Sequence, residues 1–424
     1  MIAVIRFFFA LLLYPMVAGA QDAPADSLTI YTQAFSRAAE QQQFSKAAEA
    51  ARHLTRLDPD QWMHRYDLAR AIQQAGQPKV AASQLKRLLD DGFELIIYAL
   101  HDPVFTSMRD SGQAPQLFDA IAALAAPVRN GSPAFTVNDK RLIPEGIAHD
   151  PESGDFFLSS LHQCKILRVK PDGTAKNFAT PFQDGLVPVI GLHVDAKRRH
   201  LWAASSYGYQ KIHLPDSLYG HSHLYCYNID TGRMLRRASL NPMDRRFLND
   251  MTISADGTVY ATDSRGRSLF KLEPDSDTLQ KMADLDFSPN GIALSADGKR
   301  LYLGGNDMAV MDLATEEIRP LRRSPGVHLN ADGLVRYENS LIAVQNGTLN
   351  SIRRHYLNPA GDAVIRSETL EAHLPEFEIP TTGVRFGHTF YYIANSQLHK
   401  YDEKGVLFPL TQLNPVLIRK ISLK

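Results

Sequence analysis

Ser288-Pro-Asn-Gly-Ile-Ala-Leu-Ser-Ala-Asp-Gly-Lys-Arg-Leu-Tyr-Leu303 carries the pattern from which most of this 424-residue chain is built. A run rich in β-forming residues leads from Asn290 to the Asp297-Gly298 pair, and Leu301-Tyr-Leu303 returns on the other side. An Asp-Gly pair between two such runs is a strong signal for a tight turn that joins antiparallel strands. The stretch therefore predicts a β-hairpin whose first strand begins with an Asn-Gly pair.

The same hairpin pattern occurs six times between residues 143 and 402. The equivalent positions are Gly146, Gly191, Asp250, Gly291, Gly333 and Gly383, which are 45, 59, 41, 42 and 50 residues apart. Intervals of this size, with room for two further short strands after each hairpin, are typical of β-propellers. A β-sandwich would not repeat a hairpin at this period. The sequence thus predicts a mostly β fold, a six-bladed β-propeller over residues 141–424.

Residues 21–125 differ in character, because they lack β-runs and are rich in Ala, Leu and Gln. Gln43-Phe-Ser-Lys-Ala-Ala48 aligns with Gln77-Pro-Lys-Val-Ala-Ala82 at a period of 34 residues. This small α-helical region resembles tetratricopeptide repeats. A peptide- or protein-binding groove and a helical cap on the next domain are both open, and so short an array favours the cap. The Pro, Gly, Asn and Ser residues of 126–140 predict a linker.

The first 20 residues are typical of a secretory signal peptide. Arg6 precedes an apolar run from Phe7 to Tyr14, and small residues end the segment at Ala18-Gly-Ala20. We expect cleavage after Ala20 and a periplasmic or secreted protein. A membrane anchor is the alternative, but the apolar run is short and Pro15 interrupts it.

The charge balance argues against some partners. The chain has 46 basic and 46 acidic residues, so we expect neither nucleic acid nor an anionic membrane surface as a partner. An oxidising compartment would permit a disulfide between Cys164 and Cys226, but their positions in different repeats leave the pairing open.

The residue before each equivalent glycine position varies between the repeats, and this variation points to function. In chain order these residues are Glu145, Ile190, Asn249, Asn290, Asp332 and Thr382. Equivalent positions in six blades form a ring around the channel, and two carboxylates crowded there need a cation or a proton. Oxygen ligands without His or Cys suit Ca²⁺ better than Mg²⁺ or Mn²⁺. The alternative is that these are turn residues that fill a wet channel.

Four motifs carry a resemblance to a known family. They are Pro144-Glu-Gly146, Phe247-Leu-Asn-Asp250, Ser288-Pro-Asn-Gly291 and Asn330-Ala-Asp-Gly333. Residues 141 to about 410 resemble the senescence-marker-protein/gluconolactonase/luciferin-regenerating-enzyme family, which is related more distantly to paraoxonases. The resemblance implies a six-bladed propeller that hydrolyses lactones or related esters with bound calcium. It also implies Glu145, Asn290 and Asp332 as metal ligands, and Asn249 as a further ligand or a substrate contact.

The chain also departs from the family pattern. Phe247 stands where gluconolactonases carry a sugar-binding Arg, which puts a sugar lactone in doubt and leaves the nearby Arg246 as the candidate substrate contact. Ile190 replaces the His that paraoxonases use as part of their base. Gly146 replaces an acidic ligand of their second calcium. We therefore expect one metal ion and a mechanism different from that of the paraoxonases.

These observations favour an exported, calcium-dependent hydrolase that acts on a small lactone or ester. Asp332 is the candidate general base, because one of its oxygens could stay free of the metal, and Asp250 is the alternative base. A Ser–His nucleophile built from Ser159 or Ser160 with His162 is less favoured, because the Gly-x-Ser-x-Gly motif is missing. The competing hypothesis is a non-enzymatic periplasmic binding protein with a structural calcium.

Two further features concern the mouth of the channel. The insertion Ser205–His223 should overhang it, either as a lid or as a surface excursion. The connections between second and third strands hold Asp263, Ser264, Arg265, Asn306 and Asn346. We expect these residues to be solvated turns rather than pocket residues.

Overall fold

The computed structural model describes residues 27–59, 61–208, 212–324, 327–347 and 350–424. The predicted signal peptide lies outside these residues. The chain divides into two compact units, one made of Met1–Leu88 with Pro103–Ala114 and the other of Leu89–Asp102 with Pro115–Lys424. The second unit holds the helical residues 94–100 and 115–124 together with the strands.

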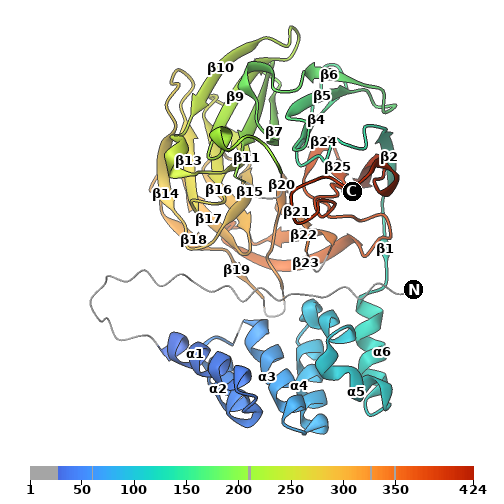
Figure 1. Cartoon of the computed structure of the whole chain (residues 1–424). Helices are drawn as coiled ribbons and strands as arrows, with labels where there is room; N and C mark the ends of the chain where they lie inside the picture. Colours follow the sequence, from blue (N-terminus) through green and yellow to red (C-terminus); the bar gives the residue numbers. More distant parts are fainter. Residues whose placement is uncertain (1–26, 60, 209–211, 325–326, 348–349) are drawn as a thin grey trace. The chain divides into compact units, whose positions relative to one another are not determined.

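The N-terminal part of the chain is helical, as predicted (Figure 1). Its elements are α1 (Ser27–Glu40), α2 (Phe44–Leu57), α3 (Trp62–Gln74), α4 (Pro78–Asp90), η1 (Glu94–Leu100), η2 (Pro103–Phe105), α5 (Thr106–Asp110) and α6 (Pro115–Leu124). The starts of α2 and α4, Phe44 and Pro78, fall at the expected 34-residue interval. Buried alanines such as Ala51, Ala69 and Ala81 let these helices approach closely. None of the described helices has the length and apolarity needed to cross a membrane.

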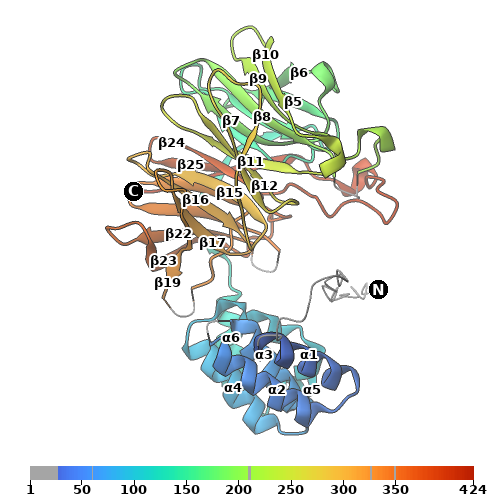
Figure 2. The same ribbon diagram turned by 90° about the vertical axis from the view of Figure 1, so that its left-hand side faces the viewer.

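The rest of the chain forms six sheets arranged as the blades of a propeller (Figures 1 and 2), which confirms the predicted fold class. The strands of blades one to three are β3 (Ile147–His149), β4 (Phe156–Ser160), β5 (Lys165–Val169), β6 (Ala175–Ala179); β7 (Val189–Asp195), β8 (His200–Ser206), β9 (Ser222–Asn228), β10 (Met234–Ser239); β11 (Leu248–Ile253), β12 (Val259–Asp263), β13 (Ser268–Leu272) and β14 (Gln280–Asp284).

Blades four to six complete the circle. Their strands are β15 (Pro289–Leu294), β16 (Arg300–Gly305), β17 (Met308–Asp312), β18 (Ile318–Pro320); β20 (Gly333–Tyr337), β21 (Ser340–Gln345), β22 (Ser351–Leu357), β23 (Ala363–Ala372) with β1 (Val128–Arg129) and β19 (Arg322–Arg323); and β24 (Gly383–Phe386), β25 (Thr389–Ile393), β26 (Val416–Ser422) and β2 (Ser132–Val137). The connections hold the short 3₁₀ helices η3 (Gln183–Gly185), η4 (Asp216–Leu218), η5 (Pro242–Asp244) and η6 (Leu410–Gln412).

Among the described strands, six hydrophobic clusters each lie between two neighbouring blades. Phe157 of blade one packs with Leu192 and Tyr225 of blade two, for example, and Phe135 of blade six packs with Phe156 of blade one. The first strands of successive blades are neighbours in the order β3, β7, β11, β15, β20, β24 and again β3. This closed circle of inner strands surrounds the channel and positions the site.

Blade six is completed by a strand that precedes blade one in the sequence. Residues 126–140, predicted to be a linker, instead contain β1, which pairs with β23, and β2, which pairs antiparallel with β26. The alternation of buried Phe135 and Val137 with exposed neighbours is a strand signal that the Pro and Gly content obscured. Near the end of blade six, Tyr401 makes only an isolated bridge with Leu407.

A buried ion pair joins blade five to blade six at this closure. Arg419 of β26 donates to both carboxylate oxygens of Glu371 of β23, at 2.6 and 3.1 Å, and both side chains are fully buried. Glu371 also accepts the backbone N–H of Gly131, between β1 and β2, at 2.9 Å. Arg419 and Arg129 share Glu376. One carboxylate therefore holds the entering N-terminal segment and both blades together.

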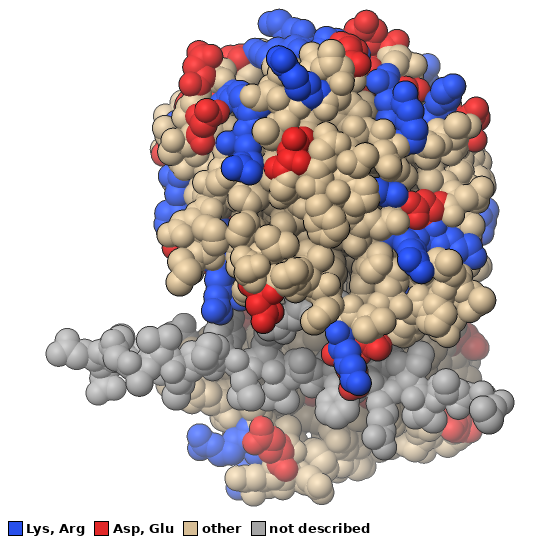
Figure 3. All heavy atoms as spheres, turned by 45° about the horizontal axis from the view of Figure 1, so that its top comes forward, with Lys and Arg blue, Asp and Glu red and all other residues tan. Residues whose placement is uncertain are grey.

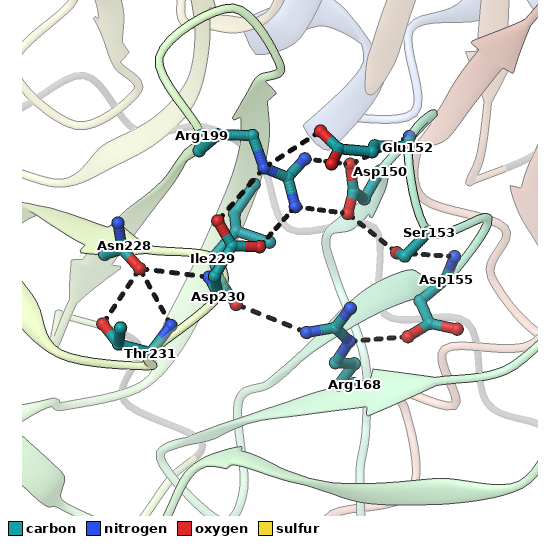
Figure 4. A network of polar contacts seen from close by, with 10 residues as sticks. All are labelled: Asp150, Glu152, Ser153, Asp155, Arg168, Arg199, Asn228, Ile229, Asp230 and Thr231. Carbon is teal, nitrogen blue, oxygen red and sulfur yellow. Dashed lines mark hydrogen bonds and ion pairs between the residues drawn. The ribbon is translucent and has the colours of Figure 1, made fainter.

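A second polar network joins blades one and two (Figure 4). Arg199 donates to both oxygens of Asp150, at 2.6 and 3.0 Å, and to Asp230 at 2.6 Å. Burial disfavours the ionised form of Asp150, but the hydrogen bonds from Arg199 and Ser153 outweigh it and lower the pKa of Asp150 to about 2. Elsewhere on the face that Figure 3 presents, basic and acidic side chains are interspersed. Cys164 and Cys226 are both buried free thiols.

The closure at blade six yields a stability prediction. Replacing Arg419 by Ala should lower the free energy of unfolding by about 3–5 kcal/mol, because Glu371 would be left buried without its charge partner. Urea unfolding monitored by the β-sheet circular dichroism signal measures this change. The matched control is Arg319→Ala, whose ion pair with Glu317 is 68% and 52% exposed and should be worth about 0–1 kcal/mol. Equal losses in the two variants would contradict the proposed role of this pair.

Candidate functional site

Three consecutive inner strands carry the same irregularity at the mouth of the channel. In β7 two residues, 190 and 191, oppose one residue of β8, and β11 and β15 repeat this at residues 249–250 and 290–291. Such a β-bulge inserts one residue, bends the strand and redirects its side chains. The predicted ring residues Ile190, Asn249 and Asn290 are each the first residue of a bulge.

Glycines allow the inner strands to approach one another at this level. A Cβ atom on Gly146 would overlap the carbonyl oxygen of Ile190 in the next blade, and one on Gly191 would overlap the carbonyl oxygen of Asn249. A side chain at either position would push two blades apart. The ring is therefore narrow, and the polar residues that precede the glycines are forced together.

The ring encloses a small cavity of about 10 Å³, which is about the space that one water molecule needs. Its lining residues are Glu145, Ile190, Gly191, Asn249, Asp250, Asn290, Asp332, Thr381 and Thr382. The structure thus brings together all six predicted ring residues and adds Asp250. The four oxygen-bearing residues expected to hold a cation share one ion-sized space.

Three carboxyl groups crowd this cavity. The Oε2 atom of Glu145 is buried without a hydrogen-bond partner. Burial, followed by the nearby charges of Asp332 and Asp250, raises the pKa of Glu145 well above its ordinary value. Burial also raises the pKa of Asp332 to about 7, although a hydrogen bond from Asn346 opposes the rise. An ion-sized space beside unpartnered carboxylate oxygen is the environment in which a divalent cation is favoured.

Asp332 is held by amides on both sides. Asn346, in the connection after β21, donates to its Oδ2 at 2.5 Å, and Asn290 donates to its Oδ1. Asn346 also donates to the carbonyl of Pro380 at 3.0 Å. In blade three, Asn249 donates from Nδ2 to the hydroxyl of Ser264 at 2.8 Å. These contacts fix the carboxylate and amide groups in place.

Asp250 is held differently, by the backbone. Its Oδ1 accepts the N–H of Met251 at 2.8 Å. Burial raises the pKa of Asp250 to about 7, against hydrogen bonds from the backbone N–H groups of Met251 and Ile292. Because Ile292 belongs to the next blade, Asp250 joins blades three and four. Asp250 borders only the small cavity and does not line the larger pocket described next.

A larger pocket of about 710 Å³ lies directly over one side of the ring, a size typical of small-molecule sites. Its described lining residues are Gly208, Tyr219, Phe247, Asn249, Ser264, Arg265, Ser288, Asn290, Gly305, Asn306, Asn330, Ala331, Asp332 and Asn346. Three of them, Asn249, Asn290 and Asp332, also line the small cavity. A molecule in the pocket would therefore meet these three side chains first, with Glu145 behind them.

The insertion after β8 borders this pocket through Gly208 and Tyr219. Its described residues pack in an apolar cluster with Ile143, Ile190 and Tyr401, and the hydroxyl of Tyr207 bonds to Ile212 and Leu214. Residues 209–211 of the insertion, which include Tyr209, lie outside the described residues. The insertion thus contributes to the pocket wall. This agrees with the expectation that it overhangs the mouth of the channel and not with a plain surface excursion.

Several site residues differ from expectation. Arg246, predicted to contact substrate, pairs with buried Asp263 at 3.2 Å and with Ser268 at 3.0 Å and does not line the pocket. Ser264, Arg265, Asn306 and Asn346, expected to be solvated turns, do line it. Their position in the repeat could have identified these four residues, because the connections that hold them lie on the same face as the starts of the inner strands.

The Ser–His alternative has no support in the geometry. The hydroxyl of Ser159 accepts the backbone N–H groups of Gly146 and Glu145, at 2.7 and 3.2 Å, and so fixes the start of β3. Ser160 donates to the carbonyl of Leu142 at 2.5 Å. His162 is 3.2 Å from the hydroxyl of Tyr401. Both serines are fully buried, and their hydroxyl groups form hydrogen bonds with backbone groups.

The donor set fits a hard cation only if the amides take part. No group of three or more His, Cys, Asp or Glu side chains in the described part of the chain is arranged as a metal site. A cation in the ring would therefore need the amide oxygens of Asn249 and Asn290 together with the carboxylates of Glu145 and Asp332. Oxygen donors of this mixed kind suit calcium, which accepts six to eight such ligands.

The crowded carboxyl groups yield a pH prediction. In the presence of a chelator, stability should fall as pH rises from about 4 to about 7, because the folded state keeps protons on Asp250 and Asp332 that the unfolded chain releases. The loss is absent below about pH 4, where both states are protonated. Melting temperatures of the wild type and an Asp250→Asn/Asp332→Asn variant should converge toward low pH and diverge toward pH 7. A pH-independent difference would contradict the crowding.

Several solved structures and one family model resemble this chain. No curated protein matches the chain. Similar solved structures include a gluconolactonase from Xanthomonas campestris (18% identity, 71% of this chain and 92% of that chain covered, TM-score 0.46). They also include the calcium-binding protein regucalcin from Agrobacterium tumefaciens (16%, 69% and 93%, TM-score 0.48). A third is an aldose sugar dehydrogenase from Streptomyces coelicolor (14%, 70% and 99%, TM-score 0.46). Residues 143–322 match the SMP-30/Gluconolactonase/LRE-like region, which confirms the predicted family resemblance for that part of the chain.

Proposed function

We propose that this protein is a metal-dependent hydrolase of lactones or related esters. One observation carries the proposal, namely that Asn249, Asn290 and Asp332 line both the ion-sized cavity and the pocket of about 710 Å³. A cation held by these residues would face the contents of the pocket. The match of residues 143–322 to a gluconolactonase-like region supports a lactone or a related ester as the substrate class.

Glu145, Asn290 and Asp332 are the proposed metal ligands, and Asn249 is a further ligand or a substrate contact. Calcium is the proposed ion, ahead of magnesium and manganese, because all these donors are oxygen atoms. A bound divalent cation would polarise the ester carbonyl and lower the pKa of a coordinated water.

Asp332 is the proposed general base. Asp332 borders both spaces, whereas Asp250 borders only the small cavity and is engaged by backbone N–H groups of two blades. Each oxygen of Asp332 accepts one amide N–H, which leaves lone pairs to receive a proton from water. Asn346 would hold the carboxylate in place during that transfer, and Asp250 remains the alternative base.

The competing proposal is a binding protein in which calcium is structural. The mostly uncharged, hydrogen-bonding lining of the pocket would then hold a small molecule without converting it, since a fold does not determine function. The helical unit would supply the site for a peptide or protein partner. Turnover separates the two proposals.

We expect the purified protein to hydrolyse at least one member of a panel of lactones and aryl esters, measured by proton release. Chelation should abolish the activity, and calcium should restore it better than magnesium or manganese. Asp332→Ala should lower kcat/KM by at least about 100-fold, because it removes both a ligand and the base.

The matched control for this experiment is Asp297→Ala, in the exposed turn of the blade-four hairpin, which should stay within about twofold of the wild type. Activity that survives complete chelation would contradict the metal-dependent mechanism. A protein that calcium stabilises against heat but that hydrolyses nothing in the panel would favour the binding protein.

We also propose that the protein is exported, on the composition of residues 1–20. Expression of the full chain in a bacterial host should yield a periplasmic or secreted form whose N-terminal sequence begins at Gln21. Replacement of Ala18 and Ala20 by bulky residues should block this processing, because signal peptidases require small residues there. A full-length N-terminus on the exported protein would contradict the proposal.

A further inference from the structure

The charge lining the larger pocket is sparse and asymmetric. Of its described lining residues, only Asp332 and Arg265 carry a formal charge, and the others include five asparagines and two serines. Asp332 lies at the floor, where it is shared with the ion-sized cavity. Arg265, in the exposed connection between β12 and β13, is the one cationic side chain on the described wall.

Arg265 is held in place without being neutralised. It donates from Nη1 to the hydroxyl of Tyr219 at 2.6 Å, and its guanidinium lies 5.4 Å from the centre of the Tyr219 ring. The position of a Cβ on Gly208 would be 3.3 Å from the same Nη1 atom, so a side chain larger than glycine at residue 208 would crowd the guanidinium. Tyr219 and Gly208 come from the blade-two insertion, whereas Arg265 comes from blade three.

Two neighbouring arginines on these blades are paired with carboxylates, and Arg265 is not. Arg246 pairs with Asp263, and Arg236 pairs with Asp277. Among the described residues no carboxylate lies within ion-pair distance of Arg265. A guanidinium has five N–H donors, and the structure uses one of them here. The remaining donors are available to a ligand in the pocket.

We propose that Arg265 binds a carboxylate of the ligand, so that the pocket selects anionic lactones or esters over neutral ones. A guanidinium binds a carboxylate through two parallel charge-assisted hydrogen bonds. The asparagine and serine side chains would hold the uncharged part of the ligand between Arg265 and Asp332. That the bound anion is a substrate rests on the proposed function. That Arg265 binds the carboxylate of a ligand does not depend on turnover.

The chain offers a matched control for Arg265. Arg245 lies on the same Tyr219 ring at 5.6 Å and is also exposed, but it does not line the pocket. Arg245→Ala therefore removes a positive charge and a cation–π contact of the same kind. Only Arg265→Ala removes the proposed carboxylate contact.

The experiment compares two ligands that differ by one carboxylate, γ-butyrolactone and 5-oxotetrahydrofuran-2-carboxylate. Binding to the full chain in calcium is measured by calorimetry, and turnover by proton release. We expect the wild type to prefer the carboxylate form. Arg265→Ala should weaken that preference by about 10- to 100-fold, the value of a hydrogen bond to a charged group. Arg245→Ala should leave the preference within about twofold.

The outcomes separate this inference from the proposed function. Loss of carboxylate preference in Arg265→Ala alone supports the inference, even if neither lactone is turned over, in which case only the hydrolase proposal fails. Equal binding of the two lactones by the wild type would overturn it. So would an equal loss in Arg245→Ala, because the effect would then come from the net charge near Tyr219. A carboxylate preference that persists in Arg265→Ala would assign the carboxylate to the calcium instead.

Discussion

The structure depends on how closely the inner strands approach one another at the mouth of the channel. At Gly146 and Gly191 the backbone of the next blade occupies the space that a Cβ atom would need. Six strands at this spacing leave a cavity of about 10 Å³, into which three carboxyl groups are placed. Like charges so close together in a buried space cannot all ionise without a counter-charge. The packing of the backbone thus creates the electrostatic problem that a cation would solve.

The same narrow ring divides the site into a closed side and an open side. Apolar residues of the blade-two insertion and of the segment around Tyr401 cover Ile190, and Glu145 is left with a buried, unpartnered oxygen. Asn249, Asn290 and Asp332 face the larger pocket instead. The proposed cation site and the proposed ligand site would therefore lie against different edges of one ring, and Asp332 and the two asparagines border both.

The blades and the ring could be predicted from the sequence because their signals are local. An Asp-Gly turn between two β-runs is complete within 16 residues, and its repetition fixes equivalent positions such as Asn290 and Asp332. The strand β2 could not be found in this way, because Ser132 pairs with Lys420 and nothing near residue 132 indicates that partner. The bulges were also hidden, since an extra residue is defined only against the opposite strand. The sequence alone does not show which of Arg246 and Arg265 faces the pocket. Arg246 does not face it, because it forms an ion pair with Asp263.

The pairing of β2 with β26 has a consequence for how the protein comes to be folded. The four main strands of five blades follow one another along the chain, but the sixth blade combines β2, which precedes blade one, with β24, β25 and β26. The loop-closure entropy of such a long-range contact grows only slowly with chain length, but strand pairing over a long sequence separation is slow. Until Val416–Ser422 arrives, β2 and β25 both present unpaired edges, which another copy of the chain could occupy. Pairing of β26 with both β2 and β25 thus removes the two strand edges at which another copy of the chain could exchange a strand.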